Sequence, residues 1–141
     1  MVNTAEGAMI EVTAKLQRIR ELTVQSANGT TAADDRTYLY TEYLALATEI
    51  ERVAQNTQWN GRDILTGDAA STGSSAVSFQ VGANGGETIS VTIGDISSTG
   101  NSTFAALQSS GASGSIATTT ASSAQTVATS TLTAIDLAIK D

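Results

Sequence analysis

The sequence predicts an α+β fold: an elongated antiparallel helical rod of two long helices plus the start of a third, with a β-hairpin packed on it. Apolar residues recur alternately three and four positions apart over residues 2–28 and 32–56, which is the spacing of a coiled-coil seam. Over residues 76–94 they instead occupy every second position, as in strands with one buried face. The three-and-four spacing returns at residues 132–141, where a third helix begins.

The first helix is predicted over residues 2–28. Leu22 and Val24 fall outside its seam, so we expect Leu22 to face solvent. The pair Asn28-Gly29 supplies a left-handed stop at the end of the helix, because glycine accepts a positive φ without strain. The seam is formed by Val2, Ala5, Met9, Val12, Leu16 and Ile19.

The second helix is predicted over residues 32–56. We expect Thr31 to cap it by accepting a hydrogen bond from the amide of Asp34, and the pair Asp34-Asp35 favours the positive end of a helix. Because only a short turn joins the two helices, they should lie antiparallel with their seams together. The second seam is formed by Leu39, Tyr43, Leu46, Ile50 and Val53.

Two reversals are predicted after the helices. Residues 57–67 form a turn in which Trp59 is expected to be a buried aromatic anchor. Residues 76–94 form a β-hairpin that reverses at Asn84-Gly85 and lays its apolar face against the helices. The glycines of this reversal could also suggest a phosphate-binding loop, but no helix and no lysine follow them.

The chain is predicted to be a single domain over residues 1–141. A connection rich in serine and threonine, residues 97–131, precedes the start of the third helix at residues 132–141. Two of the three segments with seam spacing run into the ends of the chain, which is typical of a fragment. We therefore expect missing helical continuations to complete a longer bundle that packs on copies of itself.

The composition excludes several classes of function. The chain has 14 acidic and 7 basic residues, and its net charge of −7 opposes binding to nucleic acid or to anionic membranes. It has no cysteine and no histidine, which removes the commonest nucleophile, general base and transition-metal ligands. The acidic residues lack the spacing of a calcium-binding loop, so we expect no metal site, no cofactor and no enzymatic activity.

Several stretches of the chain match one family in sequence. They are TAEGAM at 4–9, LQRIRELTVQSANG at 16–29, EIERV at 49–53, TQWNG at 57–61, FQVGANGGETI at 79–89 and LTAID at 132–136. Together they resemble the core domain of bacterial flagellin, without the terminal coiled-coil segments of that family. Trp59 stands where the family usually has phenylalanine.

The resemblance implies a secreted structural subunit of the extracellular flagellar filament, which serves motility. Its partners would be other flagellin subunits in a homopolymer and the flagellar export and assembly proteins. Two alternatives remain open. One is a junction protein between hook and filament, which shares this core, and the other is a cell-surface binding module built on a flagellin core.

The resemblance also carries over a receptor-binding surface. Flagellins of several lineages are recognised by a Toll-like receptor of animal innate immunity through the exposed side of the first two core helices. The arginine, leucine and glutamate that contact the receptor match Arg18, Leu22 and Glu42, with Gln17 alongside. The alternative is that Leu22 packs on a neighbouring subunit, in which case these residues form a subunit interface.

Overall fold

The structure, a computed structural model, describes residues 1–69, 75–102 and 104–105. The predicted start of a third helix at 132–141, and most of the connection at 97–131, lie outside these residues. The described part contains two long helices and two antiparallel strand pairs, which confirms the predicted combination of helix and sheet. In chain order the elements are α1 (Val2–Ala27), α2 (Ala33–Asn56), β1 (Gln58–Trp59), β2 (Arg62–Asp63), β3 (Ala76–Gln80) and β4 (Thr88–Thr92).

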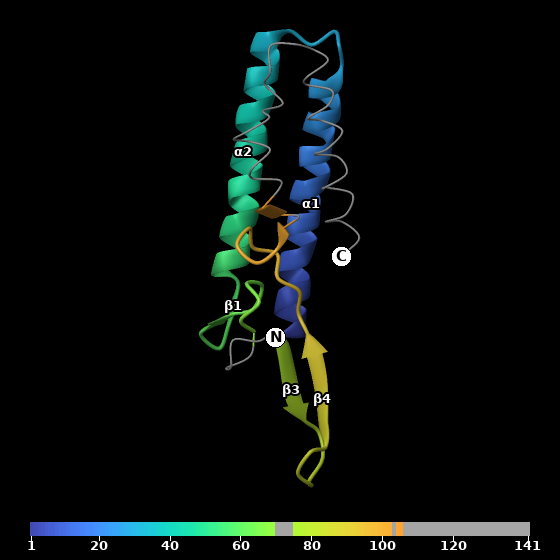
Figure 1. Cartoon of the computed structure of the whole chain (residues 1–141), viewed down its shortest axis with the longest axis vertical. Coiled ribbons are helices and arrows are strands. Elements are labelled where there is room, and N and C mark those ends of the chain that lie inside the picture. The colour runs from blue at the N-terminus through green and yellow to red at the C-terminus, as the bar shows by residue number, and fades with distance from the viewer. Residues whose placement is uncertain (70–74, 103, 106–141) are drawn as a thin grey trace.

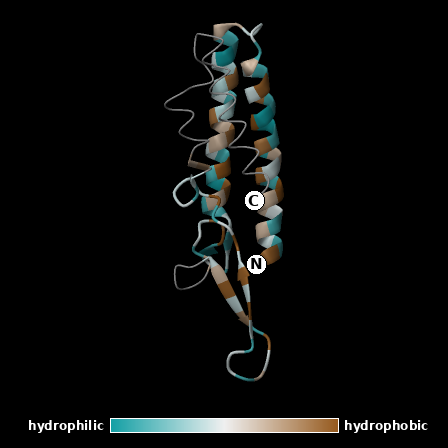
Figure 2. Ribbon diagram, turned by 45° about the vertical axis from the view of Figure 1, so that its right-hand side comes forward, coloured by the Kyte–Doolittle hydropathy of each residue, from teal (hydrophilic) through white to brown (hydrophobic). Residues whose placement is uncertain are grey.

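Helices α1 and α2 lie side by side and antiparallel, and together they form a rod (Figure 1). Hydrophobic and hydrophilic residues alternate along both helices, as they do in amphipathic helices (Figure 2). The three-and-four spacing keeps one face of each helix toward the other, so the two seams meet in the core. The buried seam residues are Val12, Leu16, Ile19, Tyr43, Ile50 and Val53, and Met9, Leu39 and Leu46 are partly buried against them.

Leu22 is buried, with 1% of its surface exposed, although its spacing places it off the seam. Thr23 and Ser26 continue the three-and-four spacing after Ile19, and both are buried. Leu22 lies three positions after Ile19 and four before Ser26, so it shares a side of the helix with these two and the buried face is wider there than the seam. The prediction that Leu22 faces solvent is wrong, whereas Val24 is exposed.

The connection between the helices differs from the prediction at both ends. Asn28 ends α1 in an extended conformation, with φ −68° and ψ 124°, so the left-handed stop predicted there is wrong. Its side-chain oxygen accepts a hydrogen bond from the Thr30 amide at 3.2 Å, and this local turn replaces the glycine stop. Thr31 does not cap α2, because its hydroxyl donates to the Gln25 carbonyl at 3.0 Å and Ala32 occupies the N-cap position.

A tight turn joins β1 to β2. Asn60 and Gly61 both have positive φ, 53° and 73°, which is the geometry that a two-residue hairpin turn requires. Trp59 lies just before this turn and is 43% exposed, so its predicted burial is wrong. The chain re-enters the core only after the turn, where Ile64 and Leu65 are completely buried.

Strands β3 and β4 form the predicted hairpin. Val77 pairs with Val91 and Phe79 with Ile89, so these four apolar side chains share one face. The reversal uses a positive φ of 94° at Gly86, the residue that directly follows the Asn84-Gly85 pair expected to make it.

The hairpin extends beyond the end of the rod at which α1 begins (Figure 1). Its face is not laid against the helices as predicted, and Ile89 remains 56% exposed. Among the described residues, the hairpin segment reaches the core where β4 ends, through Ile93, which is partly buried against it.

The segment after β4 runs back along the rod. The Ile96 amide donates to the Leu65 carbonyl at 3.0 Å, and the Ser98 amide donates to the Glu51 carboxylate of α2 at 2.8 Å. Ile96 is buried in the same core as the helices. These hydrogen bonds join the segment after β4 to α2 and to the turn that follows it, although the two are far apart in the sequence.

Candidate interaction surface

Arg18 and Glu42 meet on the surface of the rod, where α1 and α2 face one another. The Arg18 Nε–H donates to Glu42 Oε1 at 2.8 Å, and its Nη1–H donates to Glu21 Oε2 at 3.1 Å. The hydrogen bond with Glu42, and then that with Glu21, raise the pKa of Arg18 above its ordinary value. The antiparallel packing thus unites two predicted site residues that are 24 positions apart in sequence.

The other two predicted site residues have different surroundings. Gln17 is exposed next to Arg18 in the sequence, whereas Leu22, one turn further along α1, belongs to the core. Arg18, which stays protonated at any physiological pH, forms with Glu21 and Glu42 an exposed and hydrogen-bonded group. It offers a polar, charged surface suited to contact with another protein.

Gln17 also borders a shallow groove on the outer side of α1. The groove has a volume of about 410 Å³, and Ile10 within it is an exposed apolar side chain. Its lining residues are Glu6, Met9, Ile10, Thr13, Ala14 and Gln17.

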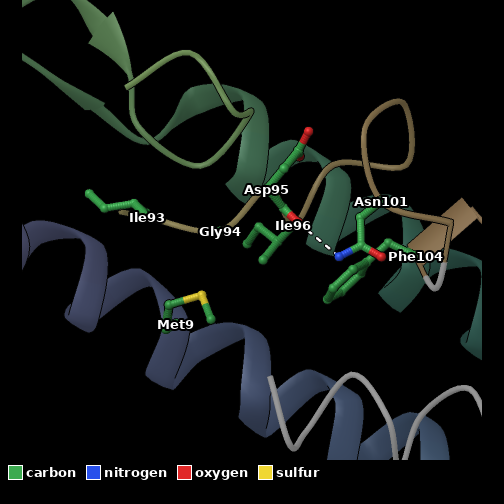
Figure 3. A pocket seen from close by; sticks show the side chains of 7 residues that line it. All are labelled: Met9, Ile93, Gly94, Asp95, Ile96, Asn101 and Phe104. Carbon is green, nitrogen blue, oxygen red and sulfur yellow. Dashed lines mark hydrogen bonds between the residues drawn. The ribbon is translucent and has the colours of Figure 1, made fainter. Parts of the chain in front are cut away.

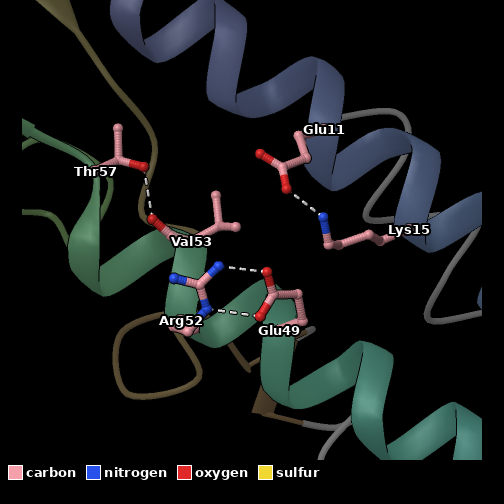
Figure 4. Close-up of polar contacts among 6 residues, drawn as sticks. All are labelled: Glu11, Lys15, Glu49, Arg52, Val53 and Thr57. Atoms are coloured by element: carbon pink, nitrogen blue, oxygen red, sulfur yellow. Dashed lines mark hydrogen bonds and ion pairs between the residues drawn. The ribbon is translucent and has the colours of Figure 1, made fainter.

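Two further ion pairs lie nearer the hairpin end of the rod (Figure 4). Lys15 pairs with Glu11 on α1, and Arg52 pairs with Glu49 on α2. The hydrogen bond from Arg52, and to a smaller degree the charge of Lys15, lower the pKa of Glu49. Charges of opposite sign therefore face one another across the two helices.

A cavity of about 270 Å³ lies between α1 and the segment after β4, and Met9 and Ile96 face one another across it (Figure 3). Its polar groups are engaged with each other, since the Asn101 side-chain amide donates to the Asp95 carbonyl at 2.9 Å. The described residues that line it are otherwise mostly apolar, and Asp95 is the one charged residue among them. The lining residues are Met9, Ile93, Gly94, Asp95, Ile96, Asn101 and Phe104.

Arg36 is a buried cation that the sequence pattern did not single out. It lies three residues before Leu39 and seven before Tyr43, so extension of the second seam toward its N-terminal end would have placed it in the core. The structure leaves 5% of its surface exposed.

Within residues 1–69, 75–102 and 104–105, no three acidic side chains gather closely enough to hold a metal ion. The two helices of this part of the chain are too polar to cross a membrane.

Comparison with known proteins identifies the family. The family described as the bacterial flagellin N-terminal helical region matches residues 1–70. Flagellin C of Vibrio cholerae is 44% identical over 98 residues, which are 70% of this chain and 25% of that protein. A flagellin of Salmonella muenchen is 43% identical over 98 residues, again 70% of this chain and 18% of that protein. The chain thus spans about a quarter or less of the length of these relatives.

Solved structures agree with the sequence comparison. Bacillus cereus flagellin superimposes with a TM-score of 0.68 at 25% identity, covering 98% of this chain and 69% of that one. FliC from Burkholderia pseudomallei gives a TM-score of 0.57 at 42% identity, covering 64% of this chain and 33% of that one. The similarity extends over sequence, helix pair and overall architecture, and the chain therefore belongs to the bacterial flagellin family.

Proposed function

We propose that this chain is part of a structural subunit of the bacterial flagellar filament, located outside the cell. The observation that carries the proposal is the flagellin match over residues 1–70, the stretch that forms the rod and the turn after it. Flagellins are structural proteins and not enzymes, in keeping with the expectation from composition. The chain's partners are other flagellin subunits and, at an earlier stage, the proteins that export and assemble them.

The surface of the rod supports packing on further copies. Ile10, Val24, Tyr38 and Leu44 are exposed although they are large and apolar. Apolar side chains on the surface of a rod are covered when rods pack side by side, which removes that area from water. A homopolymer is the arrangement in which the same surface is covered in every copy.

Immunogold electron microscopy on the source bacterium tests the filament role. Antibodies raised against the chain should label filaments along their whole length, because a filament subunit recurs at every position. Label confined to the junction between hook and filament would contradict the proposal and favour the junction protein. Deletion of the gene should remove the labelled filaments and swimming together, and a mutant that keeps both would also exclude the filament role.

We further propose that Gln17, Arg18 and Glu42 form a surface recognised by the flagellin-sensing Toll-like receptor. The supporting observation is that these three side chains are exposed, and that Arg18 and Glu42 are held together by a hydrogen bond of 2.8 Å. A guanidinium fixed in this way is already oriented for further hydrogen bonds, which favours a binding hot spot. Leu22 is buried in the core, so it affects this surface only by stabilising α1, the helix that carries Gln17 and Arg18.

Reporter cells that carry the receptor provide the test. Arg18→Ala should raise the concentration needed for half-maximal activation by about tenfold or more, as expected for the loss of a hot-spot arginine. The matched control is Arg52→Ala, because Arg52 is also an exposed arginine paired with a glutamate of its own helix. Equal responses to the two variants would exclude this surface.

A further inference from the structure

Met9 borders two hollows along α1. One is the groove of about 410 Å³ on the outer side of this helix, and the other is the cavity of about 270 Å³ between α1 and the segment after β4. The Met9 side chain is partly buried against the core, and Figure 3 shows it facing Ile96 across the cavity. Because the groove is open to solvent, a small solute can reach this side chain while the rod stays folded.

The thioether of Met9 is one of two sulfur groups in the chain. The other belongs to Met1, and the chain has no cysteine. A thioether sulfur is soft and polarizable, and peroxides oxidise it to a sulfoxide. The sulfur donates an electron pair to one oxygen of hydrogen peroxide, the O–O bond breaks, and the transferred oxygen passes its proton to the departing hydroxide, which leaves as water. The sulfur is thereby oxidised and the peroxide is reduced.

The cavity beside Met9 is suited to an apolar side chain. Ile93, Ile96 and Phe104 supply its apolar lining, and Ile96 and Phe104 are buried. A sulfoxide oxygen is a hydrogen-bond acceptor, and it is unfavourable to bury an acceptor among apolar groups without a donor. Oxidation of Met9 therefore places a polar group where the surroundings favour an apolar one.

The polar groups of the cavity are already engaged with their neighbours. The Asn101 side-chain amide donates to the Asp95 carbonyl at 2.9 Å, and the Asp95 carboxylate accepts from the Ser97 amide at 2.7 Å. To find a donor, a sulfoxide at Met9 has to draw the Asn101 amide out of this network or admit water to the cavity. Either change opens the packing between α1 and the segment after β4.

We propose that Met9 is an oxidation site at which hydrogen peroxide loosens the segment after β4, residues 93–102, from the rod. Two backbone amides attach this segment. The amide of Ile96 donates to the Leu65 carbonyl at 3.0 Å, and that of Ser98 donates to the Glu51 carboxylate at 2.8 Å. Ile96 carries the first of these amides and faces Met9, so the polarity of the Met9 side chain acts on the attachment. Methionine sulfoxide reductases reverse the oxidation, so the loosening is reversible.

The two methionines provide matched variants of the 141-residue chain. Met1→Leu leaves Met9 as the only thioether and Met9→Leu leaves Met1, while leucine keeps the size and the apolar character of the side chain. Both variants and the unmodified chain are treated with hydrogen peroxide and mapped by peptide mass spectrometry. Met9 in folded Met1→Leu should gain one oxygen at a rate within about tenfold of that in the same variant unfolded in guanidinium, because oxidation follows exposure.

Amide hydrogen exchange followed by NMR measures the effect on the structure. After oxidation of Met1→Leu, the amides of Ile96 and Ser98 should exchange several-fold faster than before, because their hydrogen bonds open more often. The amide of Tyr43, inside α2, is the control and should be unchanged. Oxidised Met9→Leu should show neither change, and methionine sulfoxide reductase should restore slow exchange in Met1→Leu.

Three results would overturn the proposal. If Met9 is oxidised in the unfolded chain but not in the folded one, peroxide does not reach its sulfur. If Met9 is oxidised and the exchange of Ile96 and Ser98 is unchanged, the attachment of the segment does not depend on it. Equal acceleration at Tyr43 would assign the effect to the whole fold, and equal acceleration in oxidised Met9→Leu would assign it to Met1.

Discussion

Leu22 shows how the surroundings of one residue decide its role. As a solvent-facing leucine it could contact a receptor or a neighbouring subunit directly. As a side chain with 1% exposure it fills the core beneath Arg18, and it affects the surface only through the stability of α1. The two roles differ in what its removal does to the free energy of unfolding.

We therefore predict that Leu22→Ala lowers the free energy of unfolding by about 2–5 kcal/mol, because truncation of a buried leucine leaves a cavity. Chemical denaturation followed by circular dichroism measures the change. Val24→Ala, two positions further along α1 at an exposed site, is the control and should change stability by less than about 0.5 kcal/mol. Equal effects of the two substitutions would show that Leu22 is not buried in solution.

Glu87 gives a prediction for pH. Its carboxylate accepts hydrogen bonds from the Asn84 side-chain amide at 3.0 Å and the Asn84 backbone amide at 3.1 Å, and these bonds hold its pKa below the ordinary 4.5. A lowered pKa in the folded state means that the carboxylate stabilises the hairpin loop above pH 4.5 and that this contribution is lost as the pH falls through the lowered value.

Amide exchange of Asn84 measured by NMR should therefore be slow at neutral pH and accelerate, beyond its intrinsic pH dependence, only below pH 4.5. Glu87→Gln removes the titrating group while it keeps the size of the side chain. The variant should show no such transition in this range, and a persistent transition would assign it to another group.

At the scale of elements, the pairing of α1 with α2 combines an apolar seam with charges along its edge. Arg18 with Glu42 is a direct cross-helix pair, and the charge of Lys15 acts on Glu49 from the facing helix. Exposed ion pairs add little to stability because water and salt screen them, so the apolar seam supplies most of it. The charges favour one alignment of the helices over others.

Charge reversal tests this edge. Arg18→Glu places like charges beside Glu42 and Glu21, and it should lower the urea midpoint of unfolding at low salt. The double variant Arg18→Glu with Glu42→Arg restores the cross-helix pair and should recover part of the loss. Urea denaturation at low and at about 0.5 M salt measures both, since salt should reduce the difference. No recovery in the double variant would show that the two helices do not use this pair.

The elements also differ in how well local sequence predicts them. The two helices begin and end within a residue or two of the predicted positions, because their apolar spacing extends over several turns. The reversals were predicted less accurately. The Asn28 side chain accepts a hydrogen bond from the turn that ends α1, and Gly86 takes the positive φ expected at the Asn84-Gly85 pair just before it. Several turn geometries satisfy the same short sequence, so hydrogen bonds to neighbouring residues select among them.

At the scale of the whole molecule, the described residues form a rod with a hairpin that extends from one end and a polar core at the other. The hairpin exposes Ile89 beyond the rod, while Arg36 is buried near the opposite turn.

The two helices, the β3–β4 hairpin, the family and the classes of function that composition excludes can be predicted from periodicity and residue type, which are local properties of the chain. Packing in three dimensions is needed to show that Leu22 and Arg36 are buried, that Trp59 is exposed and that Arg18 meets Glu42. Burial and pairing depend on which surfaces pack together and on how wide the buried face of each helix is, and neither is a property of a short stretch of sequence.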